Sequence, residues 1–446
     1  MSPVSSFVSF LATFAPLMTP SSFENFRVLA SGWVLSTRRR TVTELIQRAG
    51  AVDLKSYSTF HRFFNRAQWS IDEAGRLVFA FALRLVPHNQ VVRLVVDDTL
   101  CKKGGQHIFG TGMQRDALAS TRKLARLSWG HNWVVVGVIL EFPFAPSLCW
   151  CLPFAFRLYI TRKRPKSQRW VGPDRAHRTR PELTVEILEM IAKWHPDRRF
   201  LLVGDSAYGG GSVLKNLPAH FHLTSRIVMD AQLFAPPPPR RSGSMGRPCR
   251  KGKRLANPKQ LAASRKPWKR LSLTLYGAQQ RVLLVKETEG LWPKGDYRRI
   301  KVVVVRDPRG VNKDEAFYST NTKASSSTIL QRYAQRWCIE VAFENSKSHF
   351  GFEDPRNRTA KAVERTAPLG ALLYSLVILW FNESGHKKCR FPKRPWYERK
   401  SVASFQDMAD TLRVESLREY FRRIPGDRRG RKKVFDATCA ALGLVA

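Results

Sequence analysis

The chain has 446 residues, more than one ordinary hydrophobic core holds, and 43% of them are hydrophobic, so we expect a folded protein with two or more structural units. Its 76 basic and 35 acidic residues give a net charge of +41. This charge favours binding to nucleic acid over nonspecific surface charge or binding to a membrane surface. The seven cysteines are scattered and form no Cys-x-x-Cys pair, so neither a zinc ribbon nor a disulfide framework is supported, and a reducing cytosol is expected.

Two apolar stretches invite comparison with membrane spans, and neither is expected to cross a bilayer. Residues 131–160 contain Glu141 and several prolines, which favours a series of strands. The run from Pro368 to Phe381 is about 14 residues long, too short for a transmembrane helix. No basic residue precedes Arg27, so the start of a signal peptide is missing as well. We therefore expect buried core in both stretches and no membrane partner.

Residues 1–90 are predicted to be helical and to form an N-terminal DNA-binding region. A short helix opens at Thr41 and ends at Gly50, and a second helix, from Tyr57 to Asn65, carries basic side chains that include Arg62. A helix, a short turn and a basic second helix resemble a helix-turn-helix, in which the second helix enters the major groove of DNA. Ordinary packing of two short helices is the alternative.

Residues 91–205 are predicted to be the first part of an α/β core, because β-branched runs begin at residue 91. Three strands, one helix and a fourth strand are expected in this order: Val91–Val96, 133–140, 155–160, the helix 181–194, and Phe200–Gly204. The first strand run ends at Asp97-Asp98-Thr99, and the last ends at Asp205.

Residues 206–325 are predicted to interrupt the core with a β-rich insertion. Its strand-like runs are 271–276, 281–285, 300–305 and 316–319. Within it, residues 236–270 are expected to be a flexible basic loop, since residues 240–270 hold twelve lysines or arginines and no acidic residue. This loop is either a solvated charge run or an arm that binds the DNA backbone. The core is expected to resume over 326–385, and residues 386–446 form a basic C-terminal region.

Three acidic positions are notable because of where they lie. Asp97 or Asp98 ends one buried strand run, Asp205 ends another, and Glu340 lies on a late helix. Each alone could cap a turn or a helix, but active sites of α/β sheets collect at the carboxyl ends of strands. Three carboxylates without a suitable His/Cys cluster favour Mg²⁺ or Mn²⁺, and two such ions catalyse in-line displacement at phosphorus. Neighbours on a strand point to opposite faces, which leaves Asp97 and Asp98 as alternatives.

The late helix carries an unusual polar face. At about 100° per residue, Tyr333, Arg336, Glu340 and Lys347 fall within an arc of roughly 60°. A carboxylate between two cations and a phenol suits a metal ion beside a phosphodiester backbone better than it suits a solvated surface. Glu344 lies only about 40° further round the same helix, so face geometry leaves Glu340 and Glu344 as rivals.

These motifs resemble the DDE transposases of bacterial insertion sequences. The shared patterns are Asp-x-Thr at a strand end, Gly-Asp-Ser-x-Tyr-Gly at a later strand end, and Tyr-x2-Arg-x3-Glu-x6-Lys on a helix. The resemblance is closer to the group whose ribonuclease-H-like fold carries a β-strand insertion before the final glutamate. The segment Asn357-Arg358-Thr359 and the helical start with Trp33 and Trp69 are similar to one branch of that group. The resemblance covers roughly residues 25–385.

The resemblance implies a fold class and a set of metal ligands. The fold is α/β, a ribonuclease-H-like catalytic core interrupted by a β-rich insertion, with an N-terminal helical DNA-binding region. The Asp-x-Thr pattern selects Asp97 over Asp98, and the late helix pattern selects Glu340 over Glu344. Together with Asp205, these residues would be catalytic and would bind Mg²⁺ or Mn²⁺, as two ions.

The resemblance also implies residues that hold DNA. In this family the arginine and the lysine of the late helix hold phosphates near the cleaved end, which implies that role for Arg336 and Lys347. Tyr333 would lie beside the same DNA. A tryptophan of the β insertion stacks on a flipped base in some members; Trp292 is the candidate, and a buried core position is its alternative.

The function implied is that of a transposase that binds the terminal inverted repeats of its own mobile element. It would cleave at the ends and join the 3′ ends to target DNA by two-metal phosphoryl transfer. Its partner is double-stranded DNA, a dimer is expected in the synaptic complex, and the protein would act in the cytoplasm at the nucleoid. The alternatives are a nuclease or resolvase of the same fold that cuts without joining, and a non-catalytic DNA-binding protein derived from a transposase.

Overall fold

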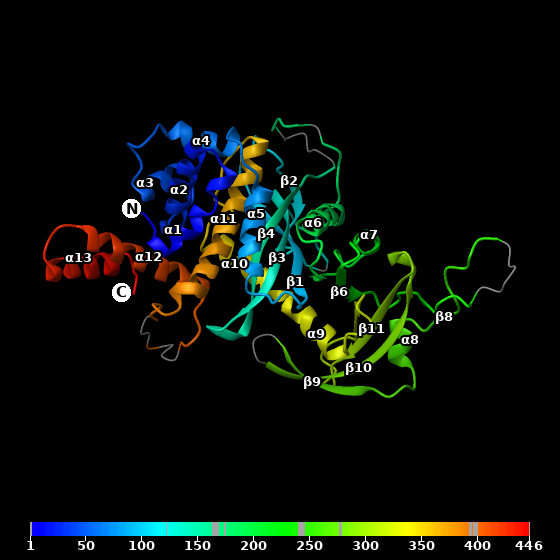
Figure 1. Ribbon diagram of the computed structural model, residues 1–446. Coiled ribbons are helices and arrows are strands. Elements are labelled where there is room, and N and C mark those ends of the chain that lie inside the picture. The colour runs from blue at the N-terminus through cyan, green and yellow to red at the C-terminus, as the bar shows by residue number, and fades with distance from the viewer. Residues whose placement is uncertain are drawn as a thin grey trace.

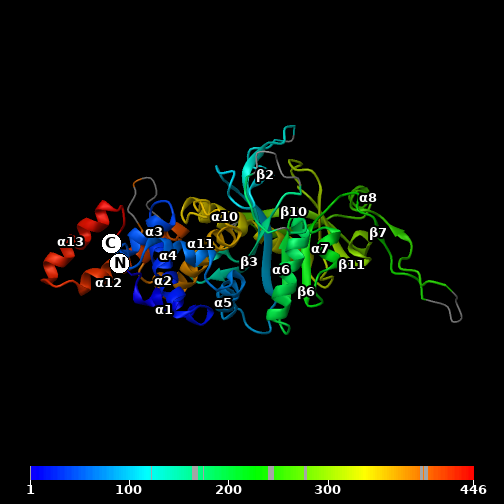
Figure 2. The same cartoon turned by 90° about the horizontal axis from the view of Figure 1, so that it is seen from above.

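The computed structural model describes residues 2–121, 123–162, 169–173, 175–239, 246–275, 279–391, 395 and 400–445. These residues form three parts that follow one another along an elongated molecule (Figure 1; Figure 2). A helical part lies at one end, a sheet covered by helices lies in the centre, and a β-rich part lies at the other end. Both chain termini lie at the helical end.

The N-terminal residues form helices, as the sequence predicts. They are α1 (Ser5–Ala12), α2 (Pro20–Leu35), α3 (Val42–Ala49), α4 (Tyr57–Asn65) and α5 (Ile71–Leu83). The hydroxyl of Thr41 accepts the backbone N–H of Glu44 and caps α3, and Gly50 ends that helix in the left-handed conformation, with a φ of 65°. Seven residues, 50–56, separate α3 from α4, against about three or four in a helix-turn-helix. Since α3 also packs chiefly on α2, the two helices are not a standard helix-turn-helix.

The C-terminal residues, expected only to be basic, fold onto these helices. The helix α12 (Phe405–Arg423) buries Met408 and Leu412 in the main core, and α13 (Arg428–Ala441) packs against α12. Arg413 of α12 donates hydrogen bonds to the backbone carbonyls of Val34 and Ser36, at 3.2 and 2.9 Å. The two ends of the chain therefore share one core.

The central sheet has the strand order of a ribonuclease-H-like core. Its strands are β1 (Val92–Lys102), β2 (Gly112–Arg115), β3 (Leu127–Phe142), β4 (Ala145–Tyr159), β5 (Phe200–Gly204) and β6 (Phe221–Ile227). In the order β4-β3-β1-β5-β6, β3 pairs antiparallel with β4 and β1, whereas β5 pairs in parallel with β1 and β6. The helix α6 (Arg180–Trp194) connects β4 to β5, and α7 (Gly211–Lys215) connects β5 to β6. The predicted fold class is confirmed.

The insertion continues the same sheet. Its elements are β7 (Leu233–Phe234), β8 (Arg254–Leu255), α8 (Pro258–Ala263), β9 (Lys269–Leu275), β10 (Gln279–Trp292), β11 (Arg298–Arg306) and β12 (Glu315–Ser319). β12 pairs antiparallel with β6, so the insertion begins after β6 and not at residue 206. Residues 240–245 of the expected flexible loop lie outside the described residues. The rest of that loop includes β8 and α8, and α8 is ordered by a capping box between Asn257 and Gln260.

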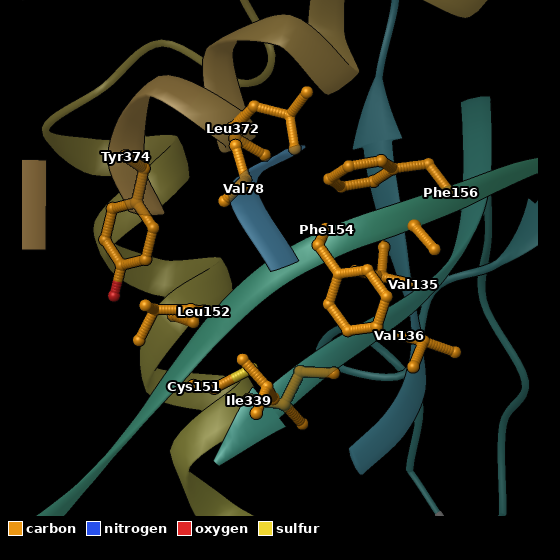
Figure 3. Close-up of a cluster of buried hydrophobic side chains, with 14 of the residues drawn as sticks. Val78, Val135, Val136, Cys151, Leu152, Phe154, Phe156, Ile339, Leu372 and Tyr374 are labelled. Carbon is orange, nitrogen blue, oxygen red and sulfur yellow. The ribbon is translucent and has the colours of Figure 1, made fainter. Parts of the chain in front are cut away.

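The late helices cover one face of the core strands. They are α9 (Ser326–Gln335), α10 (Trp337–Ser348) and α11 (Ala360–Trp380). Figure 3 shows where they meet the sheet: Ile339 of α10 and Leu372 of α11 point toward the buried side chains of β3 and β4. Val78 of α5 joins the same cluster, so the N-terminal helices and the late helices share one apolar layer against the sheet.

The helix α11 is long and apolar. Together with the turn Phe381–Gly385 it spans 26 residues and is apolar enough to cross a membrane. The sequence analysis counted only the apolar run from Pro368, and the helix is longer because residues 360–367 extend it. Within the protein, 94% of its apolar window is buried, as in the core helix of a folded protein.

Candidate active site

The register of two parallel strands brings Asp97 and Asp205 together. β1 and β5 pair in parallel up to Val96 opposite Gly204, and each aspartate is the next residue. β5 ends there, but β1 does not end at Asp97 as the sequence predicts. It runs on to Lys102 because β3 continues to pair with it, with Asp97 opposite Val135. Equivalent positions of parallel neighbours share a face of the sheet, so both carboxylates lie on the same side.

The turn after β5 fixes Asp205. Its Oδ1 accepts the backbone N–H of Ala207 at 2.8 Å and that of Tyr208 at 3.3 Å, which is the geometry of an aspartate-stabilised turn. A Cβ at Gly204 would lie 2.8 Å from the Cβ of Tyr208 and 3.0 Å from a methyl of Val96. Glycine therefore allows the turn to fold back against β1, which explains the Gly-Asp-Ser-x-Tyr-Gly pattern locally.

The same turn occupies the neighbouring carboxylate, Asp98. Its Oδ1 accepts the hydroxyl of Tyr208 at 2.6 Å, and its Oδ2 accepts Nδ2 of Asn132 at 2.7 Å and lies 3.4 Å from Arg180. Both oxygens of Asp98 are thus engaged by protein donors. These three partners were not predicted from the sequence. Tyr208 could have been found as the tyrosine of the quoted motif, whereas Asn132 and Arg180 carry no local signal.

Arg336 links Asp97 to the final glutamate. Its Nη1 donates to Oδ2 of Asp97 and its Nη2 donates to Oε1 of Glu340, each at 2.6 Å. The expected single helix is divided at Arg336 into α9 and α10, although the backbone of Arg336 stays in the right-handed helical region, with φ −51° and ψ −33°. Hydrogen bonds of the 3₁₀ type mark this boundary. The N–H of Arg336 donates to the carbonyl of Tyr333, and the N–H of Ile339 donates to the carbonyl of Arg336.

Burial and charge shift the pKa values of this group. Burial raises the pKa of Asp97 to about 7, Arg336 opposes that rise, and Asp205 and Asp98 add to it. Burial lowers the pKa of Arg336, but Asp97 and Glu340 outweigh that effect, and its pKa lies above the ordinary value. One guanidinium therefore does not fully compensate the clustered carboxylates, and the centre favours a further cation.

The donor chemistry of the centre suits a hard divalent cation. Asp97, Asp205 and Glu340 offer only carboxylate oxygens, the ligands that Mg²⁺ and Mn²⁺ prefer. Among the residues that the structure describes, no three His, Cys, Asp or Glu side chains are grouped as a metal site. The guanidinium of Arg336 bridges two of the three carboxylates and so provides part of the positive charge there.

The other residues of the late helix motif lie close to this centre with different partners. Tyr333 belongs to α9 and packs on Phe317 of β12, with ring centroids 4.6 Å apart. Nζ of Lys347 donates to the carbonyl of Leu100 at 2.6 Å and lies 3.5 Å from Glu353, so it ties α10 to β1. Glu344, the rival of Glu340, is exposed on α10.

Two further candidates lie apart from the carboxylates. Arg62 is exposed on α4, where DNA could reach it. Trp292 is only 5% exposed and packs edge-on against Tyr318, with centroids 5.3 Å apart. Trp292 therefore occupies a buried core position, which was the alternative to a stacking role. To stack on a flipped base, its ring would have to leave this core.

The chain matches a family model described as DDE superfamily endonuclease over residues 13–289. The matched range includes β1 and β5 with Asp97 and Asp205 and ends before Glu340. A search among curated proteins finds no match. The family match covers more than half of the chain and agrees with the strand order and with the pair of aspartates at adjacent strands. The chain belongs to the DDE superfamily endonucleases.

Proposed function

We propose that the protein is a DNA transposase that binds the terminal inverted repeats of its own mobile element, cleaves at the ends and joins the 3′ ends to target DNA. The main support is the carboxylate centre, in which Asp97 and Asp205 follow the last parallel pair of β1 and β5 and Glu340 reaches Asp97 through Arg336. The family supports nuclease chemistry on DNA. A dimer would pair two element ends, and the reaction would occur in the cytoplasm at the nucleoid.

In this proposal Asp97, Asp205 and Glu340 hold Mg²⁺ or Mn²⁺. Bound ions would activate the attacking water or 3′-hydroxyl and stabilise the leaving oxygen. Arg336 occupies one oxygen of Asp97 and one of Glu340, so it would compete with a bound cation for these two carboxylates. A guanidinium released from either carboxylate would be able to hold a DNA phosphate bidentately.

The charge of the chain supports the DNA side of the proposal. A net charge of +41 predicts affinity for DNA that falls steeply with salt. Arg62 on α4 is exposed and belongs to the helical part, which we assign to recognition of the element ends. Lys347, which is 24% exposed, would contribute to the DNA surface while it anchors α10 to β1.

The central test is Glu340→Gln, with Glu344→Gln as its matched control on the same helix. We expect Glu340→Gln to abolish Mg²⁺-dependent cleavage of an end-containing duplex and to leave binding of that duplex nearly unchanged. Glu344→Gln should cleave like the unaltered protein, because Glu344 is exposed outside the centre. Normal cleavage by Glu340→Gln would remove Glu340 from the site and the proposal with it.

A second candidate function is a nuclease that cuts without joining, and the endonuclease description of the family favours it. The two functions differ in their products. A transposase should join donor ends covalently to a target plasmid, whereas a nuclease should release cut ends only. Cleavage without any joined product, under conditions in which both ends are paired, would favour the nuclease.

A further inference from the structure

A basic cavity lies between the helical part and the catalytic core. It has a volume of about 300 Å³ and is formed by the start of α3, the side of α4, the segment 355–359 and the start of α11. The helix α4 packs against both α3 and α11, and the three helices lie in the same part of the molecule in both views (Figure 1; Figure 2). Its polar lining includes Arg40, Thr43, His61, Asn65, Arg356 and Arg358.

The lining of this cavity contains three arginines and no acidic residue. Arg356 and Arg358 are exposed, and within the described part of the chain neither is among the residues that form an ion pair. The nearby Asp354 does not line the cavity, and its Oδ2 accepts the backbone N–H of Arg40 at 2.8 Å. The two rim arginines therefore present positive charge without a counter-ion among the described residues.

Two helix N-termini meet at the cavity. Thr41 and Thr43, at the start of α3, and Thr359, the N-cap of α11, all line it. The side chain of Thr359 makes no capping hydrogen bond, so the first N–H groups of the 21-residue helix α11 lack that acceptor. Both helix ends bring partial positive charge to the same space, which favours an anion there.

The buried guanidinium of Arg40 is a second and independent indication of an anion. Arg40 is only 6% exposed. Its Nη2 donates to the carbonyls of Ser36 and His349, at 2.9 and 2.6 Å, but its Nε–H has no partner among the described residues. Burial and the neighbouring Arg413 lower the pKa of Arg40 to about 10, and Asp354 opposes them only in part. The Nε atom is shielded from solvent, so Arg40 acts on the cavity as a positive charge buried in its wall, and such a charge favours an anion nearby.

The cavity wall is anchored to the strand that carries Asp97. Nζ of Lys103, just beyond the end of β1, donates to the carbonyls of Glu353 and Pro355, at 2.6 and 3.0 Å. The backbone N–H of Phe109 donates to the carbonyl of Arg358 at 3.0 Å. A ligand in this cavity would therefore be held at a fixed position relative to the carboxylate centre and would touch the helical part at the same time.

We propose that this cavity binds a phosphodiester group of the DNA backbone and so fixes the register of a bound DNA end between the helical part and the carboxylate centre. The proposal rests on the proposed function for the identity of the DNA, but the anion site itself follows from the cavity alone. Arg356 and Arg358 supply charge at the rim, Arg40 adds a buried positive charge within the wall, and the starts of α3 and α11 supply backbone dipoles.

The test uses the full-length chain with both rim charges removed, Arg356→Gln with Arg358→Gln. The matched control removes two exposed arginines, Arg76 of α5 and Arg84 at its C-terminal cap, as Arg76→Gln with Arg84→Gln, and so has the same net charge. Thermal unfolding is measured with increasing inorganic phosphate. We expect saturable stabilisation of the unaltered protein and of the control, and its loss in the rim variant. Equal stabilisation of both variants by phosphate would overturn the site.

A second measurement separates DNA from free phosphate as the source of the anion. End-containing duplexes each carry one neutral methylphosphonate, moved along the backbone, and binding is measured at several salt concentrations. We expect the methylphosphonate at one position to weaken DNA binding about tenfold in the control and hardly at all in the rim variant. We also expect the slope of log affinity against log salt concentration to be smaller by about one to two in the rim variant. Phosphate stabilisation without any such position would overturn the DNA assignment.

The outcome is independent of the catalytic proposal. Binding and unfolding are measured without cleavage, so normal cleavage by Glu340→Gln would leave the cavity result intact. Conversely, a rim variant that responds like its control leaves the catalytic test unaffected. The unfolding midpoints without phosphate show whether both double variants are folded.

Discussion

The carboxylate centre and the basic cavity use arginine in opposite ways. At the centre, Arg336 is held between Asp97 and Glu340, and the surrounding carboxylates exceed it in number. At the cavity, Arg356 and Arg358 face a space lined by no acidic residue. The difference shows that net charge alone does not identify a ligand: the first site favours an added cation, and the second favours an added anion.

The comparison also indicates which interactions can be exchanged. A half-buried ion pair gains little net stability, since loss of hydration offsets much of its attraction. The side chain of Arg336 is 16% exposed, and it can therefore release Glu340 when a divalent cation binds the carboxylates. The cavity has no such internal competitor, so we expect it to bind an anion without prior rearrangement of its charged side chains.

The largest expected effect separates the two adjacent aspartates. Asp97→Asn should lower single-turnover cleavage with Mg²⁺ by about 1,000-fold or more, because it removes a ligand of the reacting centre. Asp98→Asn should cost about 10- to 100-fold, because Asp98 acts by positioning the Tyr208 turn. Equal losses in both variants, with both folded, would contradict the separation of their roles.

The next effect is on stability and its dependence on pH. The pKa of Asp97 is about 7 when folded, above its ordinary value of 3.8, so the folded state binds this proton more tightly than the unfolded state. The resulting stabilisation is complete below pH 3.8 and is lost as the pH rises through 7. It amounts to at most about 4 kcal/mol.

This pH effect is measured by denaturant unfolding in EDTA from pH 4 to pH 8. The unaltered protein should lose stability over that range relative to Asp97→Asn, whose amide does not titrate. At pH 8, added Mn²⁺ should stabilise the unaltered protein and not the variant. If the free energy of unfolding changed with pH in the same way in both proteins, the pKa of Asp97 would not be raised by its burial.

A smaller effect is expected at Arg336. Arg336→Ala should destabilise the metal-free protein by about 1–2 kcal/mol, because it leaves Asp97 and Glu340 without their shared partner. Its stabilisation by Mn²⁺ should be larger than in the unaltered protein, since no guanidinium competes with the ion. Reduced stabilisation by Mn²⁺ would mean that Arg336 supports the metal site directly.

Much of the carboxylate centre could be predicted from local sequence, and the rest of it depends on long-range packing. The strand run before Asp97, the strand end at Asp205 and the i, i+4 spacing of Arg336 and Glu340 are local, and all three could be predicted from the sequence. The continuation of β1 beyond Asp97 depends on pairing with β3, which no local pattern specifies. The boundary between α9 and α10 at Arg336 was also missed, because the helical periodicity of the sequence continues across it.

The basic cavity was missed because its parts are far apart in the chain. Arg40 and Arg358 are separated by more than 300 residues, and each belongs to an ordinary basic run in the sequence. The sequence analysis noted Asn357-Arg358-Thr359 only as a family resemblance. Only the packing of α3 and α4 beside the start of α11 shows that these cations share one space. The fold of α12 onto α2 was missed in the same way.

The smallest effect concerns Trp292, which belongs to neither site. Its ring is 5% exposed and packs on Tyr318, whose hydroxyl donates to the carbonyl of Gly209 next to the Asp205 turn. Trp292→Phe should therefore lower the free energy of unfolding by about 1 kcal/mol and leave DNA cleavage unchanged. Unfolding in denaturant and single-turnover cleavage measure the two quantities separately. Loss of cleavage at unchanged stability would mean that this tryptophan leaves the core to stack on a base, and the β insertion would then form a third DNA site.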